Sequence, residues 1–182
     1  VNGVRVKNEN GLSEVYAKYG VVLSTGGYSA NQELVTQFIG SAGAKMPIRG
    51  SRIIAGENIV LTAPFMPKVV NVDQFHCGPI YGPTGANPLN IVNNGVCVNR
   101  QGKRFIDEGK TYVQMSREVA ANTPDNWAFM VCDQTAHDIP ILKNDWASYA
   151  RTKAPVYTGN TLEEAAKAAG IDPKALKETI ED

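Results

Sequence analysis

One stretch, residues 95–112 with the sequence GVCVNRQGKRFIDEGKTY, constrains the fold of this chain most strongly. Two valines alternate around Cys97, which predicts a short strand, and Gln101-Gly102 predicts a turn directly after it. Basic, aromatic and acidic residues follow the turn, and the stretch ends in a tyrosine. Because a strand and a turn hold such side chains on a fixed frame, the stretch suits either a polar site or a purely structural corner.

The rest of the chain predicts short helices and strands in alternation. A hairpin is expected over residues 1–18, with its turn at 8–11. Further strands are expected at residues 21–23, 69–75, 91–92, 96–99 and 127–133, the first and last of them buried. Helices are expected at residues 31–39, 56–66, 111–121, 161–169 and 172–181. Ser29 or Asn31 would cap the first helix and Asp172 the last. Loops are expected at residues 40–50, 77–90 and 153–157. These elements indicate an α+β or α/β fold.

The composition argues against several classes of function. Lysine plus arginine and aspartate plus glutamate both number 18, so the formal charge is zero and no electrostatic attraction to nucleic acid or anionic membranes is expected. The three cysteines form no CxxC pair, which disfavours a disulfide framework and a zinc site. No apolar run has the length of a membrane span. Because the sequence begins with Val1, we expect a piece of a larger protein, either cytoplasmic or exported in bacteria.

Three motifs occur in the order in which one family of flavoproteins has them. They are VVLSTGGYSAN at residues 21–31, QFHCGP at residues 74–79, and the stretch from residue 95. Together they resemble fumarate reductases, succinate dehydrogenases and 3-ketosteroid dehydrogenases. In that family a strand ends in A-T-G-G-[FY]-x-x-N, and a Q-x-H-P-like segment and V-N-x-x-G-x-R-F-x-[ND]-E follow. The C-terminal TLEEAAKAAGIDPKALKETIED also resembles the family, so the resemblance covers nearly the whole chain.

The resemblance implies a part of an FAD-dependent oxidoreductase. Such an enzyme would transfer a hydride between the flavin and a carbon–carbon bond next to a carbonyl or carboxylate. Residues 1–39 would then belong to an FAD-binding domain and residues 40–153 would form the cap or substrate domain. Residues 154–182 would be the C-terminal helices of the cap domain, which lead back to the FAD-binding domain. The competing hypothesis is a non-catalytic, FAD-free structural or interaction module.

The resemblance also implies where FAD would contact this chain. Ser24, Thr25, Gly26 and Gly27 match the segment that packs against the ADP half of FAD, and glycines let a backbone approach a ligand closely. The phosphate-binding G-x-G-x-x-G is not in the sequence. We therefore expect FAD to be held by the parent protein and this chain alone to be inactive. A small-molecule substrate, and an electron-donor domain or protein outside this chain, are further implications.

Two side chains are candidates for the chemistry. His76 matches the family's histidine that stabilises negative charge on the substrate, although Cys77 replaces the usual proline after it. Tyr112 lies four residues after Glu108, where fumarate reductases have a proton-donating arginine and ketosteroid dehydrogenases a tyrosine, so the resemblance favours a ketone or enone substrate. A phenol with a pKa of about 10 needs a neighbouring group to act as a base at neutral pH. Both residues also fit structural roles, in a loop and on a packed helix.

Other polar residues have weaker claims to a site. Arg104 and Glu108 match the family's R-F-x-[ND]-E motif, in which the arginine and the acid mostly hold the turn in place and sometimes line the flavin face. We expect them to support the site rather than to contact the substrate. Arg117 would replace Tyr112 as the proton donor if the motif were displaced by one turn. His137 and two nearby aspartates resemble a metal cluster only weakly and are expected at the surface. No G-x-S-x-G elbow occurs, which disfavours a hydrolase.

Overall fold

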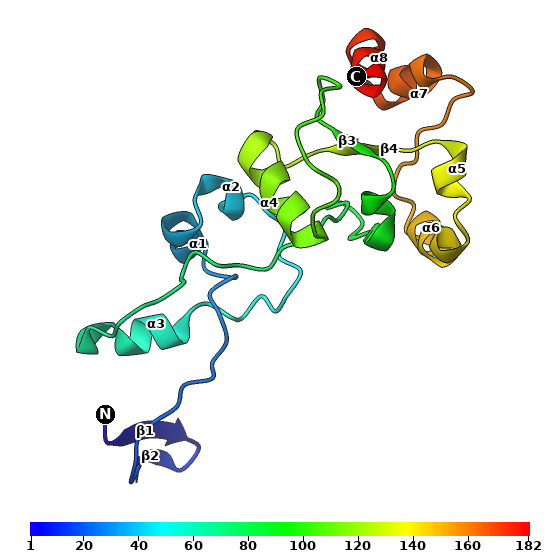
Figure 1. The fold of residues 1–182 in the computed structure, drawn as a ribbon. Helices are drawn as coiled ribbons and strands as arrows, with labels where there is room; N and C mark the ends of the chain where they lie inside the picture. Colours follow the sequence, from blue (N-terminus) through cyan, green and yellow to red (C-terminus); the bar gives the residue numbers. More distant parts are fainter. The chain divides into compact units, whose positions relative to one another are not determined.

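The computed structural model describes residues 1–182, apart from the side chain of Leu89. The chain forms two compact units, one of residues 1–35 and 48–70 and the other of residues 36–47 and 71–182. Figure 1 shows the helices and strands in chain order. Each of the two sheets consists of two antiparallel strands, and helices lie between and after these strands along the chain, so the fold is a mixture of helix and strand.

The smaller unit begins with the predicted β-hairpin. Strands β1 (Gly3–Asn8) and β2 (Gly11–Tyr16) pair antiparallel, with Asn8 opposite Gly11. The Asn8 side chain accepts a hydrogen bond from the N–H of Asn10 at 2.9 Å, and Gly11 has a φ of 106°, which side chains rarely allow. The predicted hairpin and its turn are therefore confirmed.

Three helical elements follow, of which the first begins in this unit: α1 (Gln32–Phe38), α3 (Glu57–Thr62) and the 3₁₀ turn η1 (Ala63–Phe65). The Asn31 side chain accepts hydrogen bonds from two N–H groups in the first turn of α1, at 3.1 and 3.0 Å. It also donates to the carbonyl of Ala55 at 3.1 Å, which ties this helix start to the loop before α3. The predicted helices are confirmed, and Asn31 rather than Ser29 caps the first.

Two predicted strands are wrong. Residues 21–23 and 69–75 have no strand structure, and Val22 is 88% exposed. A strand needs a neighbour to take its backbone hydrogen bonds, and in the described chain β1 pairs only with β2 and β3 only with β4. The apolar residues of these two segments therefore have no sheet to join.

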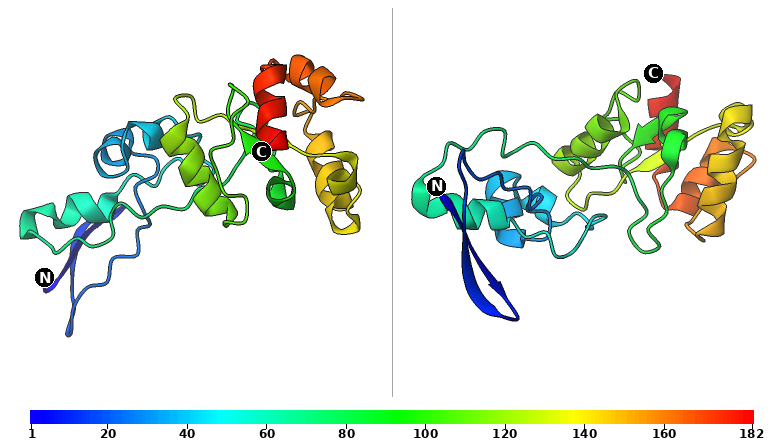
Figure 2. Two further views of the ribbon diagram at one scale, coloured as in Figure 1. Left: turned by 45° about the horizontal axis from the view of Figure 1, so that its top comes forward. Right: turned by 90° about the horizontal axis from the view of Figure 1, so that it is seen from below.

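The larger unit is built around the antiparallel pair of strands β3 (Val96–Val98) and β4 (Phe129–Val131). Helix α4 (Tyr112–Asn122) covers one face, while α7 (Leu162–Ala169) and α8 (Pro173–Glu181) cover the other, as Figure 2 shows. Strand alternation decides which core each residue joins. Cys97 packs with Val92, Ile106 and Met115 on the α4 side, and Val98 packs with Ala166, Ile171 and Leu176 on the other.

Short helical segments complete the larger unit: α2 (Ser41–Ala44), η2 (Leu89–Asn93), α5 (Gln134–His137), η3 (Pro140–Leu142) and α6 (Lys143–Arg151). The loop predicted at residues 40–50 thus contains a helical turn. The strand predicted at residues 91–92 is wrong, because this buried apolar pair lies in the 3₁₀ turn η2 after Pro88. The strand predicted at residues 127–133 is confirmed but shorter.

The predicted C-terminal helices are confirmed with their end signals. Thr161 accepts a hydrogen bond from the first turn of α7 at 3.2 Å, and Gly170 ends that helix with a φ of 72°. Asp172 caps α8 by accepting from the N–H of Lys174 at 2.9 Å. Within the described residues, no helix has the length and apolar character needed to cross a membrane.

Candidate functional site

The first turn of α4 carries one of the predicted catalytic residues. The Thr111 side chain accepts a hydrogen bond from the N–H of Gln114, and the Gln114 side chain accepts from the N–H of Thr111 at 3.1 Å. This reciprocal pair is a capping box, which satisfies backbone donors that a helix start leaves free. Met115 and Ala120 are buried on the core side of the helix. The capping box and this burial together fix the backbone of Tyr112, the first residue of α4.

His76 and Tyr112 contact each other in the larger unit. Nε2 of His76 lies 3.3 Å from Oη of Tyr112, and the two rings meet edge to face with centroids 5.7 Å apart. His76 is exposed and Tyr112 is 43% exposed, so a small molecule can reach both. With its proton on Nδ1, the imidazole accepts the phenolic hydrogen at Nε2; the other tautomer reverses the donor. The structure thus brings together two predicted site residues that lie 36 positions apart.

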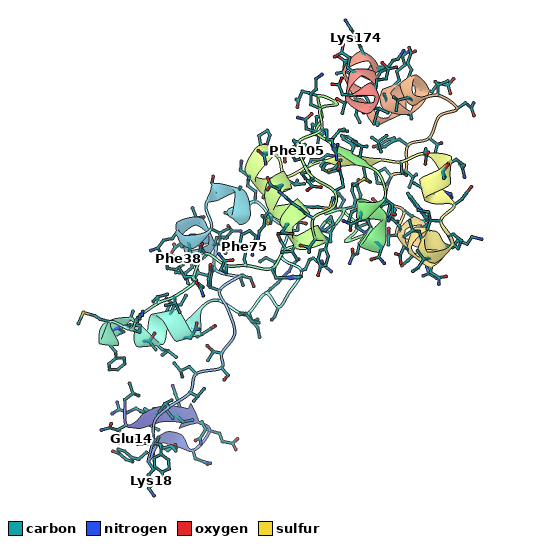
Figure 3. The ribbon with its side chains drawn as sticks, in the orientation of Figure 1. Glu14, Lys18, Phe38, Phe75, Phe105 and Lys174 are labelled. Atoms are coloured by element: carbon teal, nitrogen blue, oxygen red, sulfur yellow. The ribbon has the colours of Figure 1, made fainter. Side chains whose placement is uncertain are left out.

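Arg117 lies one helical turn beyond this pair and is directed at the backbone before His76. Its guanidinium donates to the carbonyl of Phe75 and lies 3.4 Å from Oε1 of Gln74. The guanidinium carbon is 4.9 Å from the centre of the Phe75 ring, a cation–π contact, and Figure 3 labels Phe75. Sequence reasoning considered Arg117 only as an alternative proton donor. No signal in the sequence indicated its contact with Phe75, because the acceptor is a backbone carbonyl, which every residue has.

Arg104 and Glu108 pair with each other rather than with the His76–Tyr112 pair. Glu108 is only 7% exposed, and its carboxylate accepts from the N–H of Cys97 at 2.7 Å and from Nε of Arg104 at 3.1 Å. Burial disfavours the charged form, but the hydrogen bonds from Arg104 and Cys97 outweigh it, so the pKa of Glu108 lies below its ordinary value. Glu108 therefore joins strand β3 to the turn that leads into α4.

The segment Ser24, Thr25, Gly26 and Gly27 lies in the smaller unit, and all four residues are exposed. Gly26 has a φ of 89°, and a Cβ added there would lie 3.0 Å from Cγ2 of Ile54. A Cβ added at Gly27 would meet nothing within 4 Å. The segment thus offers bare backbone on an open surface, which fits one wall of a site for the ADP half of FAD. These residues do not form an enclosed cradle by themselves.

The larger unit also contains a cavity of about 300 Å³ with mainly apolar walls. Aromatic side chains line much of it, among them Tyr81, Trp127, Trp146 and Tyr149. Neither residue of the His76–Tyr112 pair is part of the lining, so the cavity is separate from that pair.

At His137, where the sequence only weakly indicated a metal site, the structure shows an ion pair and a ring contact. Nδ1 of His137 lies 2.9 Å from a carboxylate oxygen of Asp138, and its ring packs on Trp146 with centroids 4.9 Å apart. Among the side chains that the structure describes, no three histidine, cysteine, aspartate or glutamate residues are grouped as metal ligands.

Comparison with known proteins places this chain in a family. The protein-family model of the FAD binding domain matches residues 1–182. The chain therefore belongs to the family of FAD-binding domains. The resemblance to flavoprotein oxidoreductases of the fumarate reductase and ketosteroid dehydrogenase type, predicted from the motifs, is confirmed.

Two curated relatives and one solved structure illustrate the similarity. The NADH:fumarate oxidoreductase of Klebsiella pneumoniae is 27% identical over 185 residues, which cover 100% of this chain and 19% of that protein. A probable fumarate reductase of Shewanella frigidimarina is 23% identical over 165 residues, which cover 89% of this chain and 27% of that protein. The 3-ketosteroid-Δ4-(5α)-dehydrogenase of Rhodococcus jostii has the same fold, with a TM-score of 0.68, 21% identity, and coverage of 100% of this chain and 36% of the other.

Proposed function

We propose that this chain is part of an FAD-dependent oxidoreductase that transfers a hydride between the flavin and a carbon–carbon bond next to a carbonyl or carboxylate. One observation carries the proposal: in a chain of the FAD-binding family, His76 and Tyr112 are accessible and in contact, with 3.3 Å between Nε2 and Oη, which suits an acid–base pair.

The pair would move the proton that accompanies the hydride. When bound, FAD supplies the hydride chemistry. Tyr112 would hold the proton at its phenolic oxygen, and Nε2 of His76 would accept it or return it across the 3.3 Å contact. A positioned acid or base of this kind contributes about 10²–10⁴-fold to the rate. Because a phenol is uncharged where fumarate reductases have an arginine, a ketone or enone suits the site better than a dicarboxylate.

The cofactor and domain assignments belong to the same proposal. Ser24, Thr25, Gly26 and Gly27 would line the ADP half of FAD, while the rest of the flavin site and the electron donor would lie outside this chain. Residues 40–153 would form the cap domain, between flanking parts of the FAD-binding domain. The larger structural unit contains residues 71–153 with His76 and Tyr112, together with residues 36–47 and 154–182, whereas residues 48–70 belong to the smaller unit.

The test uses the full-length protein in which this chain occurs. A flavin absorbance spectrum is expected, and after anaerobic bleaching with dithionite it should return on addition of one substrate class among fumarate, urocanate, cinnamate-type acids and steroid enones. Tyr112→Phe should lower turnover by about 10²–10⁴-fold at unchanged flavin content. Tyr19→Phe is the matched control, because Tyr19 is 92% exposed and lies outside the larger unit. Turnover of Tyr112→Phe within twofold of wild type would disprove the proton-transfer role.

The second candidate function is an FAD-free structural or interaction module. It is favoured by the sequence, in which no phosphate-binding G-x-G-x-x-G occurs. The same absorbance measurement separates the two candidates. A colourless full-length protein that takes up no added FAD would support the module and overturn the oxidoreductase.

A further inference from the structure

We infer that Arg117 is a positioning residue, which sets His76 against Tyr112 by holding Phe75, the residue directly before the histidine. The geometric part of this inference is independent of the proposed function, whereas its consequence for catalysis rests on that function.

On one side of His76, Arg117 holds Phe75 by two different contacts. It donates to the Phe75 carbonyl, and its guanidinium carbon lies 4.9 Å from the centre of the Phe75 ring. A further contact, 3.4 Å long, reaches Oε1 of Gln74. Only a planar guanidinium can combine a forked set of hydrogen bonds with stacking on an aromatic face, so lysine is a poor substitute here.

On the other side of His76, Cys77 is tied to the same helix. Its Sγ lies 3.6 Å from the carbonyl of Val113, to which the thiol donates. Burial raises the pKa of the Cys77 thiol, and the positive charge of Arg117 partly opposes that rise. Helix α4 thus holds the residue before His76 through Arg117 and the residue after it through the Val113 carbonyl.

The helix supplies the rigid spacing between the two ends of this arrangement. With a rise of about 1.5 Å per residue, Tyr112 and Arg117 lie about 7.5 Å apart along α4. Arg117, at one end of this helical segment, holds Phe75 next to His76, and Tyr112, at the other end, contacts the His76 ring. Nε of Arg117 is buried without a hydrogen-bond partner among the described residues, which costs free energy. Stability alone does not favour such an arrangement, which is typical of residues retained for function.

The geometric test is a nuclear Overhauser measurement between the His76 and Tyr112 rings in the 182-residue chain. Only two histidines are present, so His137→Gln assigns the His76 signals. The contact is expected in wild type and in Arg151→Met, a matched loss of an exposed arginine on α6. The nuclear Overhauser signal should vanish in Arg117→Met. In Arg117→Lys, which keeps the charge but lacks the planar guanidinium, it should fall below about half of the wild-type intensity.

A wild-type signal in folded Arg117→Met would overturn the inference. If Arg117→Met does not fold, Arg117→Lys decides the question in the same way, since a signal of wild-type intensity there also overturns it. In the full-length protein, Arg117→Lys should lower kcat about 10–100-fold, with KM changed less than about twofold, because small displacements of a reacting group cost up to about 100-fold. An inactive wild-type protein would refute the proposed function and leave the ring–ring measurement valid.

Discussion

Glu108→Gln tests whether the buried carboxylate organises the candidate site. Glu108 accepts hydrogen bonds from the N–H of Cys97 at 2.7 Å and from Nε of Arg104 at 3.1 Å. Hydrogen bonds to a charged group contribute about 1.5–3 kcal/mol each, and glutamine keeps one uncharged acceptor while it presents an NH₂ group to the other donor. We therefore expect the free energy of unfolding to fall by about 2–3 kcal/mol, with a fall in Tm of about 5–10 °C for a chain of this size.

The assay is urea unfolding followed by tryptophan fluorescence, because both tryptophans, Trp127 and Trp146, lie in the larger unit together with Glu108. Glu118→Gln is the control: its carboxylate makes a partly exposed ion pair with Lys110 at 3.4 Å and accepts an exposed hydrogen bond from Asn122 at 3.0 Å, so a change within about 0.5 kcal/mol is expected. A Glu108→Gln protein as stable as this control at pH 7 would refute the reasoning.

Acid provides a second check on Glu108. Because its pKa in the folded chain is below its ordinary value of about 4.3, its contribution to stability is complete above that value. The contribution is lost as the pH falls through the folded pKa, where the carboxyl gains a proton and comes to resemble glutamine. The stability difference between wild type and Glu108→Gln should therefore shrink below about pH 4. A difference that stays constant from pH 7 to pH 3 would contradict this explanation.

Three further predictions concern the frame of the larger unit. Gly102→Ala should lower the free energy of unfolding by about 2–4 kcal/mol, because φ is 72° and the new Cβ would lie 2.9 Å from the backbone N of Leu176. The control is Gly85→Ala, where φ is 69° but nothing lies near the new Cβ, so the free energy of unfolding should fall by only about 1 kcal/mol. Burial, together with the negative charge of Glu108, raises the pKa of the Cys97 thiol to about 12. At pH 8, iodoacetamide should therefore label Cys97 about 10³-fold more slowly in the folded chain than in the chain unfolded by urea, and mass spectrometry measures both rates. Thr111→Ala should lower the unfolding free energy by about 1 kcal/mol in urea melts followed by circular dichroism, through loss of the capping box on α4; no loss would contradict that role.

Local signals in the sequence were sufficient for the elements whose ends are fixed by their own side chains. Asp172 caps α8, as the sequence predicted, while Thr111 and Thr161, where the sequence placed the starts of two helices, turn out to be the caps of α4 and α7. The strands predicted at residues 21–23 and 69–75 failed for a non-local reason. Apolar periodicity indicates that a segment can be buried, but a strand also needs a partner, and periodicity does not identify one.

The candidate site shows the same division between local and non-local information. The family resemblance indicated His76 and Tyr112 separately, but their contact depends on how residues 74–77 pack along α4. The resemblance likewise could not show that Arg117 donates to a backbone carbonyl, because every residue has one and sequence does not distinguish them. Charged side chains that bind backbone are therefore the hardest part of such a site to predict.

The exposure of the His76–Tyr112 pair leads to a last prediction. His76 is exposed and Tyr112 is 43% exposed, so in the isolated chain water competes for their hydrogen bond and screens charge that develops beside it. Proton and hydride transfer of the proposed kind needs water excluded from the reacting atoms. We therefore expect the 182-residue chain, mixed with FAD, dithionite and an enone, to show no turnover above that of the same mixture without protein. The full-length protein should show turnover that is sensitive to Tyr112→Phe. Turnover by the isolated chain would mean that the described residues alone hold the flavin and cover the pair, against the open surface seen at Gly27.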